Sequence, residues 1–429
     1  MKSGKKIATL ILTGALSACF IAGATGCASS DSTIKDLQNK IDSYGTALSE
    51  YESKINELEQ LIKEMNNSLK PAEDNSPVEY SAECYAKIKY IDEVVKDRDC
   101  LAGENFKYAQ KWISWTLMQA GYPEEDIEYQ DVTFSRYYSK TVDLAQKITV
   151  ADYTTDGKLY NRIRNAQNIW EYVEAEDGAY VKADITTPNI CLTKKGKSDK
   201  QIIVGAHYDG DGTGDNGSGV SLALTTAEKI ADMELEYTIT FVFFTAEEYG
   251  THGSTAYANA MSEEEIANTL YMINLDSLVC GDYTYLYGGV QDNETKTVKQ
   301  TEAYDNAMAV AKSLGLSFKS NPWTWDNLSP NDKKAGKEYP SYASPSTGDW
   351  SDHEGFAAIG IPYVYFEATN WEIPDYTGYG ETYLVGMLMN TENDYLEYIE
   401  KYFPGRIQEH MKTFSTLLYA LVTQTNVNF

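Results

Sequence analysis

Three short apolar runs in the middle of the chain each end at residues that can bind a divalent metal. The runs and the residues after them are 202–204 with His207, 239–244 with Glu247 and Glu248, and 272–273 with Asp276. Continuous apolar runs of this length predict buried strands. The stretch Asp215-Asn216-Gly217-Ser218-Gly219 precedes apolar residues at helical spacing, which predicts a capped helix. We therefore predict an α/β fold with a mostly parallel central sheet flanked by helices, and candidate ligands at its carboxyl edge.

A heptad pattern of apolar residues runs without a break from Ile34 to Leu69. Its a positions are mostly β-branched, which favours a parallel two-stranded coiled coil. We predict a coiled-coil stalk over residues 28–70 and a homodimer through residues 32–70. The alternative is a single helix that packs on its own domain.

The N-terminus has a basic start followed by an apolar run from Ile7 to Ala24, the pattern of a secretory signal. The run ends Ala24-Thr25-Gly26-Cys27, which resembles the lipobox of bacterial lipoproteins. Residues 1–27 are predicted to be a lipoprotein signal peptide, with the membrane reached through lipidated Cys27 on the extracellular face. The alternatives are an ordinary signal peptide and an uncleaved anchor.

The rest of the chain is predicted to form one domain after a short linker. Residues 71–79 form a polar linker and residues 80–429 the predicted domain. Further expected elements are a helix at 106–120, strands at 127–134, 178–192 and 361–366, and a closing helix at 407–421. Residues 135–177 receive no assignment.

The net charge and the spacing of the cysteines argue against two classes of function. Lys and Arg number 36 against 64 Asp and Glu, a net charge of -28, which repels phosphate backbones and argues against nucleic acid as a partner. The cysteines beyond the export segment lack zinc-finger spacing; they are Cys84, Cys100, Cys191 and Cys280. Two alternatives remain for these cysteines: a disulfide between Cys84 and Cys100, or buried free thiols.

The candidate residues suit hydrolysis assisted by a metal. Asp209, two positions after His207, can orient the imidazole. Asp215 can bridge two metals, and of the adjacent pair Glu247 and Glu248 one can bind metal while the other acts as general base. The structural alternatives are a helix cap for Asp215 and a turn residue for Asp276.

Together these motifs resemble the co-catalytic zinc aminopeptidases, which are related to glutamate carboxypeptidases and glutaminyl cyclases. The segment 351–356 with Asp352 and His353 is similar to a later family motif, and the resemblance covers about residues 80–424. It implies that His207, Asp215 and Asp276 hold one zinc, that Asp215 and Glu248 hold another, and that Glu247 is the general base. Asp209, Asp352 and His353 are expected around this set, as supporting residues or as site wall.

One position departs from the family pattern. The histidine that completes the second zinc site is matched here by Asn390, in Asn390-Thr391-Glu392-Asn393-Asp394. An amide oxygen is a poorer zinc ligand than imidazole. Three alternatives follow, in this order: Asn390 binds a second zinc loosely, His353 moves in to replace it, or the second site is lost.

The resemblance implies a surface-anchored, zinc-dependent exopeptidase. Within this class it favours an aminopeptidase that hydrolyses N-terminal residues from peptides with metal-activated water. The alternatives are a carboxypeptidase or glutaminyl cyclase on the same scaffold, and a non-catalytic or single-metal peptide-binding lipoprotein. Aromatic residues near the site line a pocket or belong to the core; they are Trp323, Trp325, Trp350, Tyr363 and Trp371.

Overall fold

The computed structural model describes residues 77–101, 103–139, 150–151, 160–164, 170–174, 180–373 and 380–427. The chain divides between Ser76 and Pro77, and every described residue belongs to the second unit. The predicted signal peptide, Cys27 and the stalk over 28–70 lie outside the described residues and stay predictions.

A seven-stranded sheet forms the centre of this unit. Its strands, in sheet order, are β1 (Ile127–Ser139), β5 (Tyr180–Lys194), β7 (Thr238–Phe244), β6 (Gln201–His207), β8 (Thr269–Leu275), β12 (Tyr363–Thr369) and β9 (Tyr283–Tyr287). The four central strands β7, β6, β8 and β12 are parallel to one another. Strands β1, β5 and β9 join at the two sides by antiparallel pairing. The predicted fold class, a mostly parallel central sheet, is confirmed.

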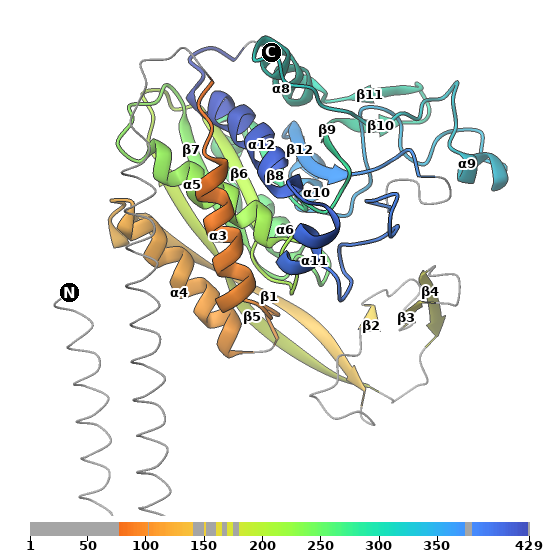
Figure 1. Ribbon diagram of the computed structural model, residues 1–429, viewed down its shortest axis with the longest axis horizontal. Helices are drawn as coiled ribbons and strands as arrows, with labels where there is room; N and C mark the ends of the chain where they lie inside the picture. The colour runs from red at the N-terminus through yellow and green to blue at the C-terminus, as the bar shows by residue number, and fades with distance from the viewer. Residues whose placement is uncertain are drawn as a thin grey trace, which may run out of the picture. The chain divides into compact units, whose positions relative to one another are not determined.

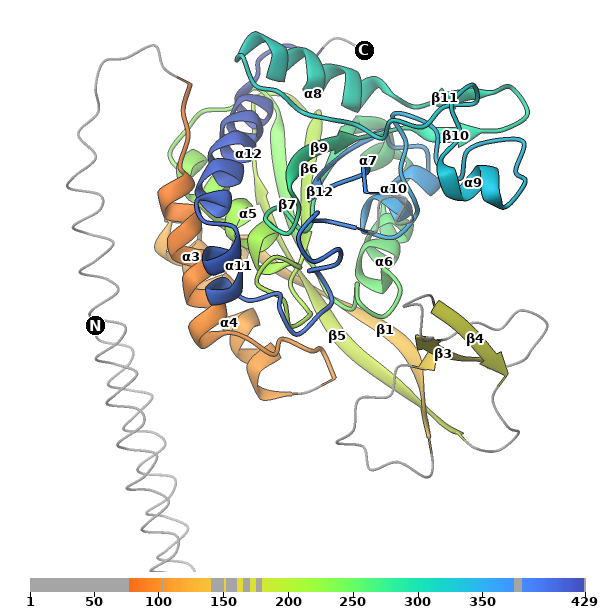
Figure 2. The same ribbon diagram turned by 45° about the vertical axis from the view of Figure 1, so that its right-hand side comes forward.

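Helices cover both faces of the sheet, so the central strands are buried on both sides and read as continuous apolar runs (Figures 1 and 2). One face carries α3 (Ser81–Val94), α4 (Glu104–Gln119), α5 (Gly217–Ile230), α8 (Glu302–Ser313) and α12 (Arg406–Thr423). The other face carries α6 (His252–Ala260) and α10 (His353–Ala358). The expected helices near 106–120 and 407–421 correspond to α4 and α12.

Short elements complete the described chain. They are η1 (Glu124–Asp126), α7 (Glu263–Asn268), β10 (Val290–Asp292), β11 (Thr297–Lys299), α9 (Pro330–Lys334) and α11 (Leu396–Tyr402).

The start of α5 is fixed tightly against the end of β8. The side chain of Asn216 accepts a hydrogen bond from Gly219 N at 3.0 Å and donates one to Leu275 O at 2.8 Å. A Cβ on Gly219 would clash with that same carbonyl oxygen, so glycine permits the close approach. The loop before α5, which contains Asp215, is thereby held beside the residue that follows β8.

Residues 135–177, for which no element was predicted, include the connection between β1 and β5, and these two strands form a long antiparallel pair. Strand β5 pairs with β7 only from Ile190 onward, while β1 and β5 stay paired back to Ser139 and Tyr180. This pair therefore continues past the end of β7, as Figure 2 shows. A small antiparallel sheet lies between its strands in sequence, made of β2 (Val150–Ala151), β3 (Tyr160–Arg164) and β4 (Trp170–Glu174).

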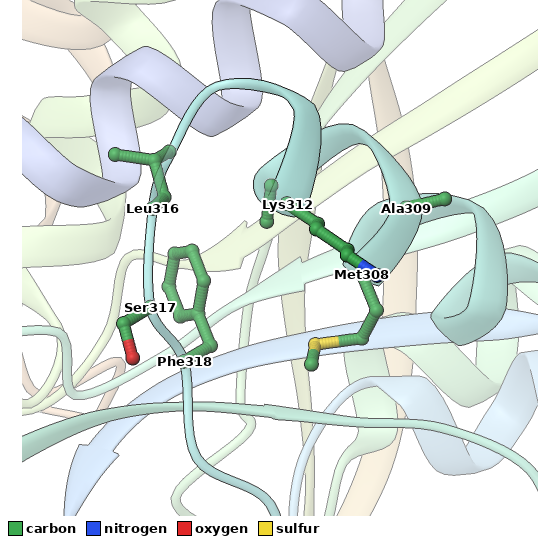
Figure 3. Close-up of a pocket in the computed structure, with 7 residues that line it drawn as sticks. Met308, Ala309, Lys312, Leu316, Ser317 and Phe318 are labelled. Atoms are coloured by element: carbon green, nitrogen blue, oxygen red, sulfur yellow. The ribbon is translucent and has the colours of Figure 1, made fainter.

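A surface hollow of about 390 Å³ lies beside α8 (Figure 3), and none of the predicted site residues lines it. Met308 and Lys312 reach it from the helix, and Leu316 and Phe318 from the segment that follows. Elsewhere, Cys84, Cys191 and Cys280 are buried free thiols, and Cys100 is also buried. Among the described helices, none combines the length and the apolarity that a membrane span needs.

Candidate metal centre

The predicted ligands gather at one edge of the sheet because three parallel strands end there. His207 is the last residue of β6, Glu247 and Glu248 follow β7, and Asp276 follows β8. Asp215 reaches the same edge from the loop before α5. Side chains far apart in sequence therefore meet beyond the carboxyl ends of the strands, where α/β proteins bind their ligands.

His207 is the centre of this group. Its Nε2 atom lies 3.1 Å from Asp215 Oδ1, 3.4 Å from Asp276 Oδ1 and 3.8 Å from Glu247 Oε2. The ligand atoms of His207, Glu247 and Asp276 all lie within 4.8 Å of one another. The imidazole is 1% exposed, yet neither ring nitrogen makes a hydrogen bond.

The electrostatics of the group are those of crowded, buried charges. Burial by itself lowers the pKa of His207, but Glu247 and Asp276 outweigh it and raise that pKa well above its usual value. Burial raises the pKa of Glu247 well above its usual range, and the carboxylates of Asp276 and Asp352 add to the effect. Burial also raises the pKa of Asp215, and Asp276 adds to the rise. The set therefore lacks positive charge, which a divalent cation supplies.

Buried polar partners fix the orientation of these ligands. Asp209 is fully buried; its Oδ1 lies 3.6 Å from His207 Nδ1 and accepts a hydrogen bond from Glu247 N at 3.1 Å. Ser351 donates to Asp276 Oδ2 at 2.7 Å and accepts from the side chain of Asn274 at the same distance. One carboxylate oxygen of Asp276 is thereby occupied, and Oδ1 remains without a partner in the direction of His207.

Two residues that were not predicted as site residues hold the loop that carries Asp215. Asp394 accepts hydrogen bonds from Gly214 N at 2.7 Å and from Asp215 N at 2.9 Å. Arg98 is 2% exposed and donates to Tyr208 O at 3.1 Å and to Gly212 O at 2.9 Å.

Asn390 also reaches Asp215. Its amide Nδ2 donates to Asp215 Oδ2 at 3.0 Å. Because a carboxylate only accepts hydrogen bonds, the amide turns its donor rather than its oxygen to the position where a second metal would share Asp215.

The remaining predicted residues surround the centre. The carboxylate of Glu248 packs so closely on Gly210 that a Cβ there would overlap it, and burial raises the pKa of Glu248. Asp352 is fully buried, which raises its pKa to about 7. His353 Nε2 contacts Gly348 O at 3.1 Å, and burial lowers the pKa of this histidine to about 4. The ring of His353 packs on Tyr363 and Tyr365, with centroids 4.5 and 5.0 Å apart.

The residues of the group fit a bound zinc ion. Zinc takes imidazole nitrogen and carboxylate oxygen ligands, and His207 and Asp276 present such atoms, buried and without hydrogen bonds. The oriented partners Asp209 and Ser351 are the kind that metal ligands require.

Sequence patterns carried different amounts of information about these residues. Asp394 stands in the same short motif as Asn390, so its place near the site was available from that motif. Arg98 lies in an ordinary polar stretch before α4, and only the fold brings it under the loop. A third residue beside the site, Glu367, lies inside the apolar strand β12, where all seven residues are buried. A carboxylate within an apolar run is itself a signal in the sequence.

The chain is similar in sequence to known peptidases. The model of peptidase family M28 matches residues 189–414. The alkaline phosphatase isozyme conversion protein of Escherichia coli is 30% identical over 265 residues, which are 56% of this chain and 72% of that protein. Aminopeptidase YwaD of Bacillus subtilis is 30% identical over 244 residues, which are 55% of this chain and 45% of YwaD.

The chain is also similar to a further curated relative and to a solved structure. The probable lipoprotein aminopeptidase LpqL of Mycobacterium tuberculosis is 27% identical over 179 residues, covering 40% of this chain and 32% of LpqL. The zinc aminopeptidase BSAP of Bacillus subtilis superposes with a TM-score of 0.53 at 16% identity, over 82% of this chain and 97% of BSAP. At that identity the likeness concerns the fold.

Proposed function

The chain belongs to peptidase family M28, and from that premise we propose that it is an aminopeptidase which removes N-terminal residues from peptides. It is a zinc metallopeptidase, as its family and its aminopeptidase relatives require. The observation that carries the proposal is the buried His207, which makes no hydrogen bond and is enclosed by three carboxylates at the ends of parallel strands.

Each residue of the centre receives a role in this proposal. His207, Asp215 and Asp276 hold one zinc, with Glu248 and Asn390 at the second position. Zinc, when bound, acidifies a water molecule and polarises the scissile carbonyl. Glu247 takes a proton from the attacking water and returns it to the leaving amine. Burial raises the pKa of Glu247, which makes its carboxylate a stronger base toward the proton of the water.

The test is a zinc assay combined with a panel of aminoacyl reporter substrates. Wild-type protein is expected to hold zinc and release the reporter from unblocked substrates, while N-acetylated versions stay intact. Glu247→Gln keeps a side chain of the same size but no basic carboxylate, so we expect turnover to fall by about 1,000-fold with zinc retained. Full turnover in that variant, at unchanged zinc content, would remove Glu247 from its role.

A single tightly held zinc is the form of this function that the contacts around Asn390 favour. The amide donates to Asp215, and His353 is engaged by Gly348 and by the rings of Tyr363 and Tyr365. Movement of His353 into the centre would break all three contacts. We therefore rank loose binding of a second zinc by Asn390 ahead of a movement of His353 into the place of that ligand.

We also propose that the protein is anchored in the cell membrane on the extracellular face, through lipid on Cys27. The sequence at residues 24–27 and the name of the relative LpqL support this. Cys27→Ala should move the protein from the membrane fraction to the medium and abolish labelling by a radioactive fatty acid. Unchanged fractionation and labelling would contradict the anchor.

The stalk at residues 28–70 is proposed to form a homodimer. Sedimentation of the exported chain with and without these residues tests it, since the shorter protein should be a monomer and the longer one a dimer. A monomeric longer protein would rule out the stalk dimer.

A further inference from the structure

Glu367 is a buried carboxylate in the strand beside the metal centre. It is 2% exposed and shares a face of β12 with Tyr363 and Tyr365. Phe366 pairs with Leu275 in the parallel β8–β12 ladder, and Asp276 N donates to Phe366 O at 3.2 Å. The next step along both strands therefore places Glu367 next to Asp276, at the rim where the ligands of the centre meet.

Three aromatic side chains surround Glu367. Tyr365 donates to Glu367 Oε1 at 3.2 Å, and Trp371 Nε1 donates to the hydroxyl of Tyr287 at 2.7 Å. The ring of Tyr287 lies 5.5 Å from that of Tyr365 and 6.1 Å from that of Trp371, between centroids. We call Glu367, Tyr287, Tyr365 and Trp371 the aromatic box.

The second oxygen of Glu367 lacks a partner. Oε2 is buried and makes no hydrogen bond, whereas a buried carboxylate oxygen of a folded protein normally has one. An unpaired carboxylate oxygen held among aromatic rings is costly unless a positively charged group joins it.

The chemistry of the aromatic box favours an organic cation as its ligand. Carboxylates pair with ammonium and guanidinium groups, and aromatic faces attract the same groups. Anions are disfavoured because Asp276 and Glu381 act on the same region with negative charge. Adjacent strands lie about 4.8 Å apart, so a side chain that starts beside Asp276 and has the length of lysine reaches Glu367.

We propose that the aromatic box is a subsite which selects lysine or arginine as the N-terminal residue of the substrate, with Glu367 as the specificity-determining group. This inference rests on the proposed aminopeptidase function. All three rings are buried, and the half-buried rings of Tyr342 and Trp350 pack on Trp371 at 6.3 and 6.4 Å. Access of a cationic side chain to Glu367 therefore requires a movement of Trp371.

The experiment compares Lys-, Arg-, Leu- and Ala-reporter substrates on the zinc-loaded full-length protein and its Glu367→Gln variant. Wild type is expected to prefer Lys and Arg. The variant should lose at least about tenfold in kcat/KM for these two and change less than about threefold for Leu and Ala. The matched control is Glu372→Gln, an exposed carboxylate on the same segment that pairs with Lys319, and its preference should equal that of wild type.

The outcomes separate this inference from the proposed function. A wild type that cleaves the Leu reporter without preference for Lys or Arg overturns the subsite alone. Equal losses on all four substrates also overturn it, because they indicate a role toward the backbone ammonium or the fold. A zinc-loaded wild type that cleaves none of the reporters defeats the proposed function itself.

A second measurement needs no variant and covers the case in which Glu367→Gln does not fold. Lysine amide and norleucine amide have side chains of nearly equal length and differ in charge. As inhibitors of Leu-reporter hydrolysis by wild type, lysine amide should be at least about tenfold more potent. Equal potency of the two amides would overturn the proposal.

Discussion

Replacement of Arg98 by methionine tests how the loop that carries Asp215 is held. Arg98 is buried and donates to the carbonyls of Tyr208 and Gly212, on both sides of Asp209 in the sequence. Burial lowers the pKa of this guanidinium, while Asp209 and Asp394 oppose the shift. Methionine fills a similar volume but leaves the carbonyl of Tyr208 without a donor, that of Gly212 with only Gly217 N at 3.4 Å, and the carboxylates without their cation.

The magnitude follows from these two hydrogen bonds. A hydrogen bond to a charged group contributes about 1.5–3 kcal/mol, so Arg98→Met should lower the free energy of unfolding by about 3–6 kcal/mol. That is a large part of the stability of an ordinary domain. Arg98→Lys keeps the charge but not the planar fork that serves two acceptors, so its loss should be intermediate.

The assay is urea unfolding of zinc-free and zinc-loaded protein, followed by circular dichroism. Lys107→Met is the matched control, since Lys107 is exposed and its pairing with Glu104 at 3.8 Å should contribute less than about 1 kcal/mol. A loss below about 1 kcal/mol for Arg98→Met, with an unchanged denaturant slope, would refute the reasoning. That result would mean that the hydrogen bonds from the loop backbone to Asp394 are enough to hold the loop.

The other predictions concern zinc stoichiometry and acid stability. Asn390→His replaces an amide donor by a good zinc ligand, so metal analysis after gel filtration should find about one zinc in wild type and about two in the variant; two tightly held ions in wild type would contradict this. Burial lowers the pKa of His410 from 6.5 to about 3, so its stabilising effect is complete above pH 6.5 and is lost as the pH falls from 6.5 toward 3. At pH 5 the free energy of unfolding should be lower by about 2 kcal/mol than at neutral pH because of this group. The His410→Gln variant should not show this part of the decrease when its unfolding is measured at both pH values. Equal acid sensitivity of the two proteins would show that His410 is accessible to protons in the folded state.

Local patterns along the chain were enough to predict the centre of the fold. The apolar run 239–244 became β7, and the spacing after Asp215 became α5, because strands buried on both faces and capped helices depend on neighbouring residues. His207, Glu247 and Asp276 were placed at one rim from the same argument, since parallel strands bring their carboxyl ends together. The roles assigned to these residues remain predictions that zinc analysis and the Glu247 variant address.

The sequence by itself determined which residue types follow each central strand, and so which chemistry the rim can support. Only the tertiary structure decided what lies behind that rim. Arg98 reaches the loop of Asp215 from the segment before α4, and Glu367 meets Tyr287 and Trp371 through the pairing of β12 with β9. Contacts of this kind join elements far apart in sequence, and no periodicity within one element encodes them, because they depend on how whole elements pack against one another.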